Sequence, residues 1–324
     1  MRLERPRTPS TASGKAPIIP ARRSAAVLAA WLLAAHAASA QEHPIEIFHV
    51  QGNVHMLVGA GANIAVQTGD EGVLVVDTGL SERRDDVLAA IRRLSDKPIR
   101  WIVNTHAHAD HTGGNEALSQ AGMTVNGNPA AIIAHERVLA RMSDAGRPIT
   151  ELPLNTFFEP RRDFYFNGEA IFLYHVPAAH TDGDVIVYFR GSDVLVAGDL
   201  FVTTHYPVVD LEAGGGIDGF IQGLNTMLDI AVPAYLQEGG TYVIPGHGRV
   251  GDEADVVEYR DMVQIIRDRV QSLVEQGAGL DEVLAAKPTL DYDPRYGHPD
   301  NGWTTEAFVE AVYRDLVNRR SATQ

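Results

Sequence analysis

Residues 105–114 of this chain read Thr-His-Ala-His-Ala-Asp-His-Thr-Gly-Gly, and they decide how the rest of the sequence is interpreted. The segment holds three histidines and one aspartate within six positions, directly after the strand-like residues 99–104. A chain of this composition would contain such a pattern by chance about one time in a thousand. Imidazole and carboxylate groups this close together are typical of a transition-metal site.

The spacing also predicts which way the four polar side chains of this segment face. In an extended or looped segment alternate positions point the same way, so we expect His106, His108 and Asp110 on one side. His111 then faces elsewhere, which lets one short loop serve two neighbouring metals. On its own the motif predicts a metal site that leaves room for a second ion.

Three later residues continue the pattern. His180, Asp199 and His247 each follow a strand-like run, as residues 105–114 do. Loops that follow strands gather at one edge of a sheet in layered α/β folds, and active sites occupy such edges. The sequence thus predicts a single site built from four separate segments.

The composition restricts the metals that this site could hold. The chain has no Cys, which excludes thiolate ligands and disulfides and leaves imidazole and carboxylate. Such a set suits Zn²⁺, with Fe or Mn as alternatives. Two cations a few Å apart would lower the pKa of a shared water and hold it as a bridging hydroxide that attacks a carbonyl.

These motifs carry a resemblance to a known family. THAHADHTGG (105–114) is followed in order by AAHTDGD (178–184), AGD (197–199) and PGHG (245–248). Together they resemble the metallo-β-lactamase superfamily, from about Asn53 to His247. The resemblance implies a metal-dependent hydrolase with an α+β fold, a four-layer αββα sandwich. The alternation of strand-like and helix-like stretches favours the same layered fold.

The resemblance also implies a role for each motif residue. Asp199 corresponds to a carboxylate that bridges two Zn²⁺ ions. The ligands of the first ion and then of the second correspond to His106, His108 and His180, and to Asp110, His111 and His247.

Four further roles are expected around these ligands. Asp110 is expected to act in catalysis by steering the proton of the nucleophile. Asp77, at the end of residues 72–77, is expected to support the ligand loop by hydrogen bonds, although a strand-end turn explains it equally well. His205 and Tyr206 are candidates for the substrate pocket, with an ordinary loop role as the alternative.

Departures from individual branches of the family bear on the substrate. Asp199 stands where many β-lactamases have a Cys ligand, and Val202 stands where they carry a Lys. Tyr206 lies four positions beyond the Tyr of lactone-cleaving relatives. His108 argues against the flavin-linked di-iron relatives, which have Glu there. We therefore expect a glyoxalase II-like or lactonase-like hydrolase of a small ester, thioester, lactone or amide.

Three alternatives stay open at this stage. One is a divergent β-lactamase, and a second is an iron-containing oxidoreductase, because the same ligands can hold redox-active iron. The third is a non-catalytic metal-binding protein, which is disfavoured because every ligand position is filled. The sequence leaves the identity of the substrate and the oligomeric state open.

Residues 1–40 have the features of an export signal. Two arginines precede an apolar run at 24–38, and residues 38–40 form a small-x-small cleavage pattern. Cleavage is expected after Ala40, giving a periplasmic or secreted protein without a membrane partner; an uncleaved anchor is the alternative. Residues 41–324 are expected to form one domain with a helical C-terminal portion.

Removal of this segment makes the chain strongly acidic. It takes away six of the 27 basic and one of the 42 acidic residues, which leaves 21 and 41 and a formal net charge of −20. Such a surface repels phosphate backbones, so we expect a small-molecule substrate and no nucleic-acid partner, RNA included.

Overall fold

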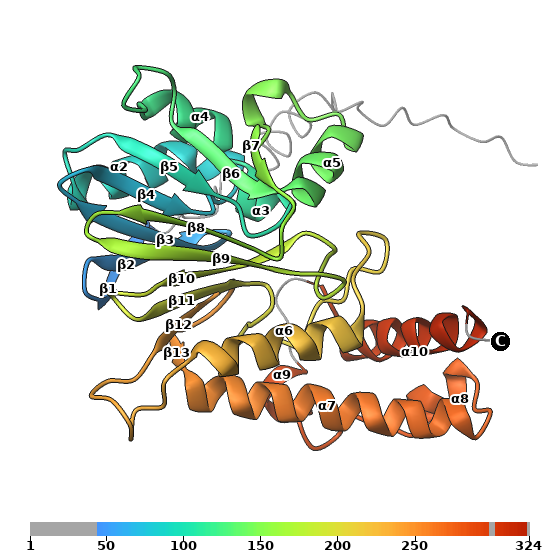
Figure 1. The fold of residues 1–324 in the computed structure, drawn as a ribbon. Helices are drawn as coiled ribbons and strands as arrows, with labels where there is room; N and C mark the ends of the chain where they lie inside the picture. The colour runs from blue at the N-terminus through green and yellow to red at the C-terminus, as the bar shows by residue number, and fades with distance from the viewer. Residues whose placement is uncertain (1–43, 298–301, 323–324) are drawn as a thin grey trace, which may run out of the picture. The chain divides into compact units, whose positions relative to one another are not determined.

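Two β-sheets face each other in the computed structural model, which describes residues 44–297 and 302–322 (Figure 1). The seven strands of the first sheet are, in spatial order, β1 (Glu46–Gln51), β2 (Val54–Ala60), β3 (Ala62–Gly69), β4 (Gly72–Val76), β5 (Ile99–Val103), β6 (Ala131–His135) and β7 (Asn155–Phe157). Strands β1 to β4 pair antiparallel, and β4 to β7 pair parallel.

The second sheet has six strands. In spatial order they are β13 (Gly251–Asp252), β12 (Tyr242–Pro245), β11 (Val194–Gly198), β10 (Asp184–Phe189), β9 (Glu169–Val176) and β8 (Arg161–Phe166). All pairs are antiparallel except β11 with β12, which run parallel.

Helices cover the outer face of each sheet (Figure 1). Those on the side of the first sheet are η1 (Ser81–Arg83), α2 (Arg84–Leu94), α3 (Ala109–Thr112), α4 (Asn115–Ala121), α5 (Glu136–Asp144) and η2 (Ile149–Glu151). Those on the side of the second sheet are α6 (Ile217–Ile230), α7 (Glu253–Glu275), α8 (Leu280–Ala285), α9 (Asp293–Tyr296) and α10 (Thr305–Ala322). The layers run helix, sheet, sheet, helix, so the predicted α+β four-layer sandwich is confirmed.

The hydrophobic side chains follow these layers. Along β4, Leu74 and Val76 belong to the cluster between the two sheets, whereas Val73 and Val75 pack with α2. A strand has a side-chain period of two, so a strand covered on both faces reads as a continuous apolar run. A third cluster, which includes Phe220 of α6, lies between the second sheet and its helices.

Two local features show how neighbouring residues determine structure. The turn Asn167-Gly168 joins β8 to β9 with positive φ at both residues, as the Asn-Gly pair predicts. Ser81 is the first residue of the single turn η1, and no side chain caps η1 or α2. The acidic first turn and basic last turn of α2 complement the helix dipole instead.

The N-terminal predictions are not addressed by this structure. Residues 1–40, with the expected export signal and cleavage point, lie outside the described residues. From Pro44 onward the described residues form one compact unit. Within 44–297 and 302–322, no helix is long and apolar enough to cross a membrane.

The intersheet core offers a test of the fold. Leu74 is fully buried between the sheets, and Leu74→Ala is expected to lower the free energy of unfolding by about 2–5 kcal/mol, because it removes apolar contacts and leaves a cavity. Leu290, which is 58% exposed, provides the control, since Leu290→Ala should change it by less than about 0.5 kcal/mol. Urea unfolding followed by circular dichroism measures both, and equal effects would contradict this description of the core.

Candidate metal centre

The predicted metal ligands meet at one edge of the sandwich. The loop after β5 carries residues 105–111, while His180, Asp199 and His247 follow β9, β11 and β12. Backbone hydrogen bonds join the two sheets at this edge, from Asn63 N to Gly246 O at 2.8 Å and from Val185 N to Thr105 O at 2.8 Å. Segments far apart in the sequence are thereby held side by side.

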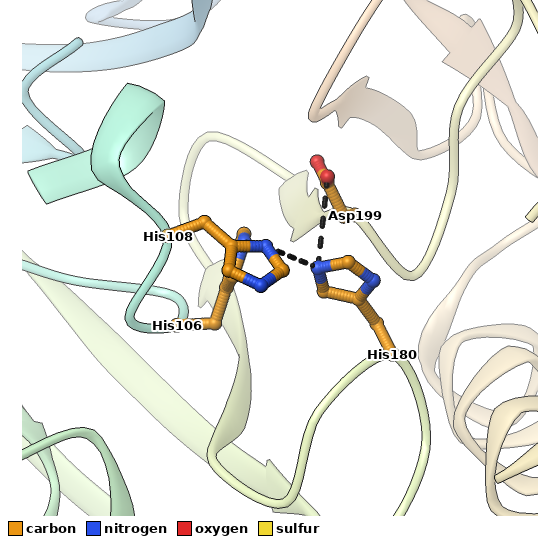
Figure 2. A group of neighbouring side chains, drawn as sticks. All are labelled: His106, His108, His180 and Asp199. Carbon is orange, nitrogen blue, oxygen red and sulfur yellow. Dashed lines mark hydrogen bonds and ion pairs between the residues drawn. The ribbon is translucent and has the colours of Figure 1, made fainter. Parts of the chain in front are cut away.

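One group of ligand atoms comes from His106, His108, His180 and Asp199. Figure 2 shows their side chains pointing toward one another, and the four ligand atoms lie within 4.8 Å of each other. His108 Nδ1 is 3.2 Å from His106 Nε2 and 2.9 Å from His180 Nε2. Ligand atoms around tetrahedral zinc lie about 3.3 Å apart, so this spacing fits a metal.

In each of the three histidine rings, the nitrogen that points away from the group donates a hydrogen bond. The other ring nitrogen therefore has its lone pair free to bind a metal. His180 Nδ1 donates to the Val208 carbonyl at 2.7 Å, and His108 Nε2 donates to Asp210 at 3.0 Å. Thr105 Oγ1 donates to Asp77, so His106 Nδ1 donates to Thr105 Oγ1 at 3.1 Å.

Three imidazole lone pairs therefore converge on one point. A proton on His108 Nδ1 can serve either His106 or His180, but not both. A metal ion can accept all three lone pairs, and fixing the ring tautomer through an outer hydrogen bond is common at metal sites.

The second group comes from Asp110, His111 and His247, whose ligand atoms also lie within 4.8 Å of one another. His247 Nε2 is 3.3 Å from Asp110 Oδ2. His111 Nε2 and Asp199 Oδ1, 3.2 Å apart, are buried without a hydrogen-bond partner. Buried polar atoms are rarely left so, and here they face a space suited to a cation.

Asp199 lies between the two groups. Its Oδ1 is 3.2 Å from His111 Nε2 and 3.5 Å from His247 Nε2, while its Oδ2 is 3.7 Å from His180 Nε2. One carboxylate oxygen thus faces each group.

The electrostatics of the two groups differ. Burial lowers the pKa of His180 to about 4 and that of His106 well below its usual value, so both rings are neutral and able to bind metal. Burial also acts on His247, but Asp110 and Asp199 outweigh it and raise its pKa to about 9. His111 and His247 in turn lower the pKa of Asp199. The ionised carboxylate of Asp199 therefore lies where positive charge beside it is required.

The comparison with known families gives the same picture. The model of the metallo-β-lactamase superfamily matches residues 57–247, which is more than half of the chain. The chain belongs to the metallo-β-lactamase superfamily. Members of this superfamily bind metal ions, usually zinc, and residues 57–247 include all seven candidate ligands.

Named relatives in the superfamily have several activities. A metallo-beta-lactamase type 2 from Bacillus sp. (strain 170) is 22% identical over 204 residues, covering 63% of this chain and 73% of that protein. A linear primary-alkylsulfatase from Pseudomonas sp. (strain ATCC 19151) is 25% identical over 259 residues, covering 66% of this chain and 47% of that protein. This chain is a hydrolase of a family that acts on small molecules.

Solved structures support the fold. The stereoselective inverting sec-alkylsulfatase Pisa1 from Pseudomonas sp. has a TM-score of 0.66 at 17% identity, covering 83% of this chain and 50% of that one. A metallo-beta-lactamase from Pontibacter korlensis has a TM-score of 0.55 at 19% identity, covering 68% of this chain and 99% of that one. The chain spans about half the length of each alkylsulfatase that it matches.

The signature loop departs from the extended geometry expected for it. His108 has extended backbone angles, but residues 109–112 form the short helix α3. The alternation therefore ends at His108, and Asp110 joins His111 and His247 instead of sharing a side with His106 and His108. The expectation that His106, His108 and Asp110 face one way is wrong, because a helical turn does not keep the period of two.

Asp77 lies beneath this loop. Its Oδ2 accepts from His111 Nδ1 at 2.7 Å and from Thr105 Oγ1 at 2.7 Å, and its Oδ1 accepts from Thr105 N at 2.8 Å. Its φ of +63° is unusual for a non-glycine residue, although Asp tolerates it better than most. Asp77 thus orients one candidate ligand and the strand-end backbone from a strained turn.

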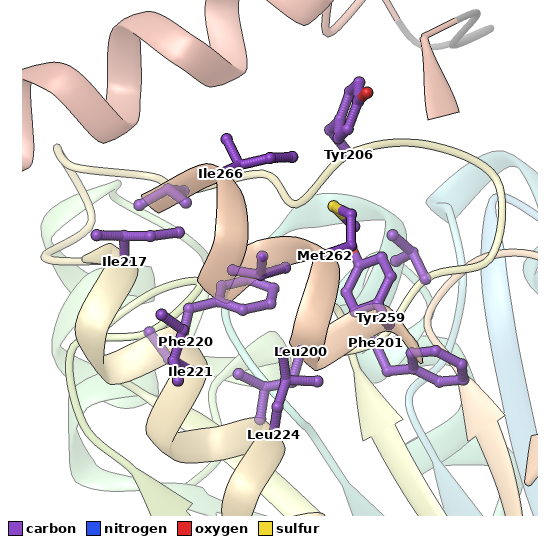
Figure 3. Close-up of a cluster of buried hydrophobic side chains, with 14 of the residues drawn as sticks. Leu200, Phe201, Tyr206, Ile217, Phe220, Ile221, Leu224, Tyr259, Met262 and Ile266 are labelled. Carbon is purple, nitrogen blue, oxygen red and sulfur yellow. The ribbon is translucent and has the colours of Figure 1, made fainter. Parts of the chain in front are cut away.

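Of the two candidate pocket residues, only His205 lies beside the metal centre. Its ring centroid is 6.0 Å from that of His247. Tyr206 is 1% exposed and belongs to the cluster of buried side chains drawn in Figure 3. Its ring stacks on Phe308, and its hydroxyl donates to Asp293 at 2.8 Å. The prediction that Tyr206 lines the pocket is wrong, because the C-terminal helices bury its ring.

A close approach near the centre requires glycine. A Cβ at Gly246 would lie 1.9 Å from Asp199 Oδ1, so this position of the PGHG motif admits no side chain without displacing the carboxylate. The motif therefore serves Asp199 as well as His247.

Sequence reasoning missed Asp210, which accepts the hydrogen bond from His108 Nε2. This bond lowers the pKa of Asp210 to about 2. The residue lies in a loop without periodic pattern, and 102 positions separate it from His108. Its only sequence signal is a lone Asp after an apolar triplet, 207–209, which is too common to interpret.

Asp210→Asn tests the orientation of His108. Asp210 accepts from both His108 Nε2 and Ala213 N, whereas the single carbonyl oxygen of Asn cannot satisfy both sites. We expect about 10–100-fold weaker binding of one zinc ion, measured by competition with a chromophoric chelator. Asp291→Asn, an exposed aspartate of an ion pair with Arg269, is the control and should leave zinc binding unchanged. Identical affinities in all three proteins would show that Asp210 does not orient His108.

Proposed function

We propose that this chain is an exported dinuclear zinc hydrolase that cleaves an ester, thioester, lactone or amide of a small molecule. The observation that carries the proposal is the position of Asp199, with one oxygen toward each group of ligand atoms. A carboxylate so placed suits a pair of cations, because each oxygen has a lone pair for one of them.

Charge also favours a cation in each group. Each group holds one carboxylate, Asp199 in the first and Asp110 in the second, and all seven side chains belong to the imidazole and carboxylate set that suits Zn²⁺. No other pair of groups of this kind occurs within residues 44–297 and 302–322.

In the proposed reaction, bound cations supply Lewis acidity that polarises a carbonyl and lowers the pKa of water. The residues of the chain provide orientation and proton transfer. Asp77 and Asp210 fix the rings of His111 and His108. The Asp110 side chain is 32% exposed, and its pKa is lowered by His247 although burial opposes this. An ionised carboxylate at the open side can accept the proton of an attacking water.

One position bears on the proposed substrate class. Val202 is buried in the core between the second sheet and its helices, so no cation extends from this position to hold a carboxylate. This favours an ester, a thioester or a lactone over a β-lactam as the substrate. A hydroxyacylglutathione hydrolase from Anaeromyxobacter dehalogenans (strain 2CP-C), 32% identical over 100 residues, covers 31% of this chain and 32% of that protein.

Export is proposed from the sequence of residues 1–40, with its basic start, apolar run and cleavage pattern before Gln41. The absence of Cys is compatible with an oxidising compartment, because no free thiol is at risk there.

Metal removal and a substrate panel test the activity. Purified protein should contain two zinc ions per chain and hydrolyse at least one of an aryl ester, an acyl-homoserine lactone and S-lactoylglutathione. A chelator should abolish this activity, and added zinc should restore it. The panel also contains a cephalosporin and a primary alkyl sulfate. Hydrolysis of the cephalosporin alone would favour a divergent β-lactamase, whereas stoichiometric iron with oxygen consumption would overturn the hydrolase proposal.

Asp199→Ala tests the bridging role. Removing both oxygens should leave one metal weakly held and reduce kcat by more than the roughly 10–100-fold typical of losing a partner of a ligand. Asp163→Ala, an exposed aspartate on β8, is the control and should keep two metals and full activity. Metal content is measured by mass spectrometry, and folding by circular dichroism. A folded Asp199→Ala protein with two zinc ions and normal turnover would exclude a bridging carboxylate.

A further inference from the structure

Helix α5 supplies no candidate ligand, yet one of its side chains contacts two loops of the metal centre. Arg141 Nε and Nη2 donate to the two oxygens of Asp182 at 3.2 and 2.9 Å. Its Nη1 donates to the carbonyl of Glu212 at 3.0 Å. A single guanidinium therefore joins the loop after β9 to the loop before α6.

These two loops carry His180 and Asp210, which belong to or contact the three-histidine group, His106, His108 and His180. Asp182 lies two residues after His180, and Glu212 lies two residues after Asp210, which orients His108. The loops also bind each other through their backbones, from Asp182 N to Ala213 O at 2.9 Å and from Asp210 N to His180 O at 3.0 Å.

Directional hydrogen bonds add to the packing of this region. A pocket of about 190 Å³ that is partly open to solvent lies beside His108, and its lining includes Arg141, Val138, Asp182, Gly183 and Asp210. Side chains do not fill this space, so here the bonds of Arg141 supplement the contacts that close packing provides elsewhere.

The bonds of Arg141 are suited to fixing position more than to adding stability. Its side chain is 37% exposed and that of Asp182 is 22% exposed, and ion pairs this accessible to water contribute little to the free energy of unfolding. The planar guanidinium nevertheless binds both carboxylate oxygens at once, which sets angle as well as distance.

We propose that Arg141 is a positioning residue for the three-histidine group: it holds the loops of His180 and Asp210 in register, and through Asp210 it holds the ring of His108. The inference rests on the proposed metal-binding function. It predicts that Arg141 influences the affinity of one metal and not of both. The residues of the second group lie in α3 and in the loop after β12, whereas Arg141 donates to the loops after β9 and before α6.

The experiment compares Arg141→Met, Arg141→Lys and Arg269→Met with the wild-type protein. Met keeps the length of the side chain without donors, and Lys keeps the charge without the planar fork. Arg269 is the matched control, because it also binds one carboxylate and one loop carbonyl, Asp291 and Pro288, far along α7. Stepwise zinc dissociation constants come from chelator competition, and Tm is measured on the metal-free proteins.

We expect one of the two dissociation constants to rise about 10–100-fold in Arg141→Met, with the other unchanged. Arg141→Lys should show a smaller rise in the same constant, and Arg269→Met none. The Tm of the metal-free variants should stay within about 2 °C of the wild-type value, because the ion pair is exposed. The Nε2–H proton of His108, followed by NMR of histidine-labelled zinc protein, should exchange faster in Arg141→Met.

Other outcomes would overturn the inference. Unchanged zinc affinities in a folded Arg141→Met protein would show that the loops hold themselves, while two-metal binding by the wild-type protein would leave the proposed function intact. Arg141 would have a general structural role if Arg141→Met weakened the binding of both zinc ions equally. The same would follow if the Tm of metal-free Arg141→Lys fell as much as that of metal-free Arg141→Met. A wild-type protein that binds no zinc would overturn the proposed function and this inference together.

Discussion

The structure depends on placing ionised carboxylates and neutral imidazoles together where two sheets meet. Asp199 and Asp110 have lowered pKa values although burial raises the pKa of a carboxyl, and they lie beside rings with raised pKa values. Burying a charge is costly unless an opposite charge lies next to it. The carboxylates at this edge of the sandwich thus need positive charge beside them. Protons on His111 and His247 supply only part of that charge.

The fold provides this arrangement through strand direction. Strands β4, β5, β11 and β12 all end at the edge that carries the candidate ligands, and hydrogen bonds such as Asn63 N to Gly246 O join the two sheets there. Each ligand loop is short, so the end of the preceding strand determines where its ligand lies. The large apolar clusters between and outside the sheets then make that position rigid.

Much of this could be predicted because the information is local. A histidine after a strand-like run stays at the end of that strand, and the Asn167-Gly168 turn sets the geometry of its hairpin within two residues. The layered fold and the membership of the family follow from four short motifs in a fixed order. Strand ends and tight turns are determined by residues that adjoin in sequence, which is why patterns identify them.

The features that sequence reasoning missed are those set by distant contacts. Tyr206 and His205 are neighbours with similar surroundings in sequence, but Phe308, a hundred residues later, buries the first ring, while His247 lies near the second. Asp210 and Arg141 act on candidate ligands only because loops from different sheets converge. The ligands of such a centre can be found from motifs, whereas the groups that orient them belong to the packing.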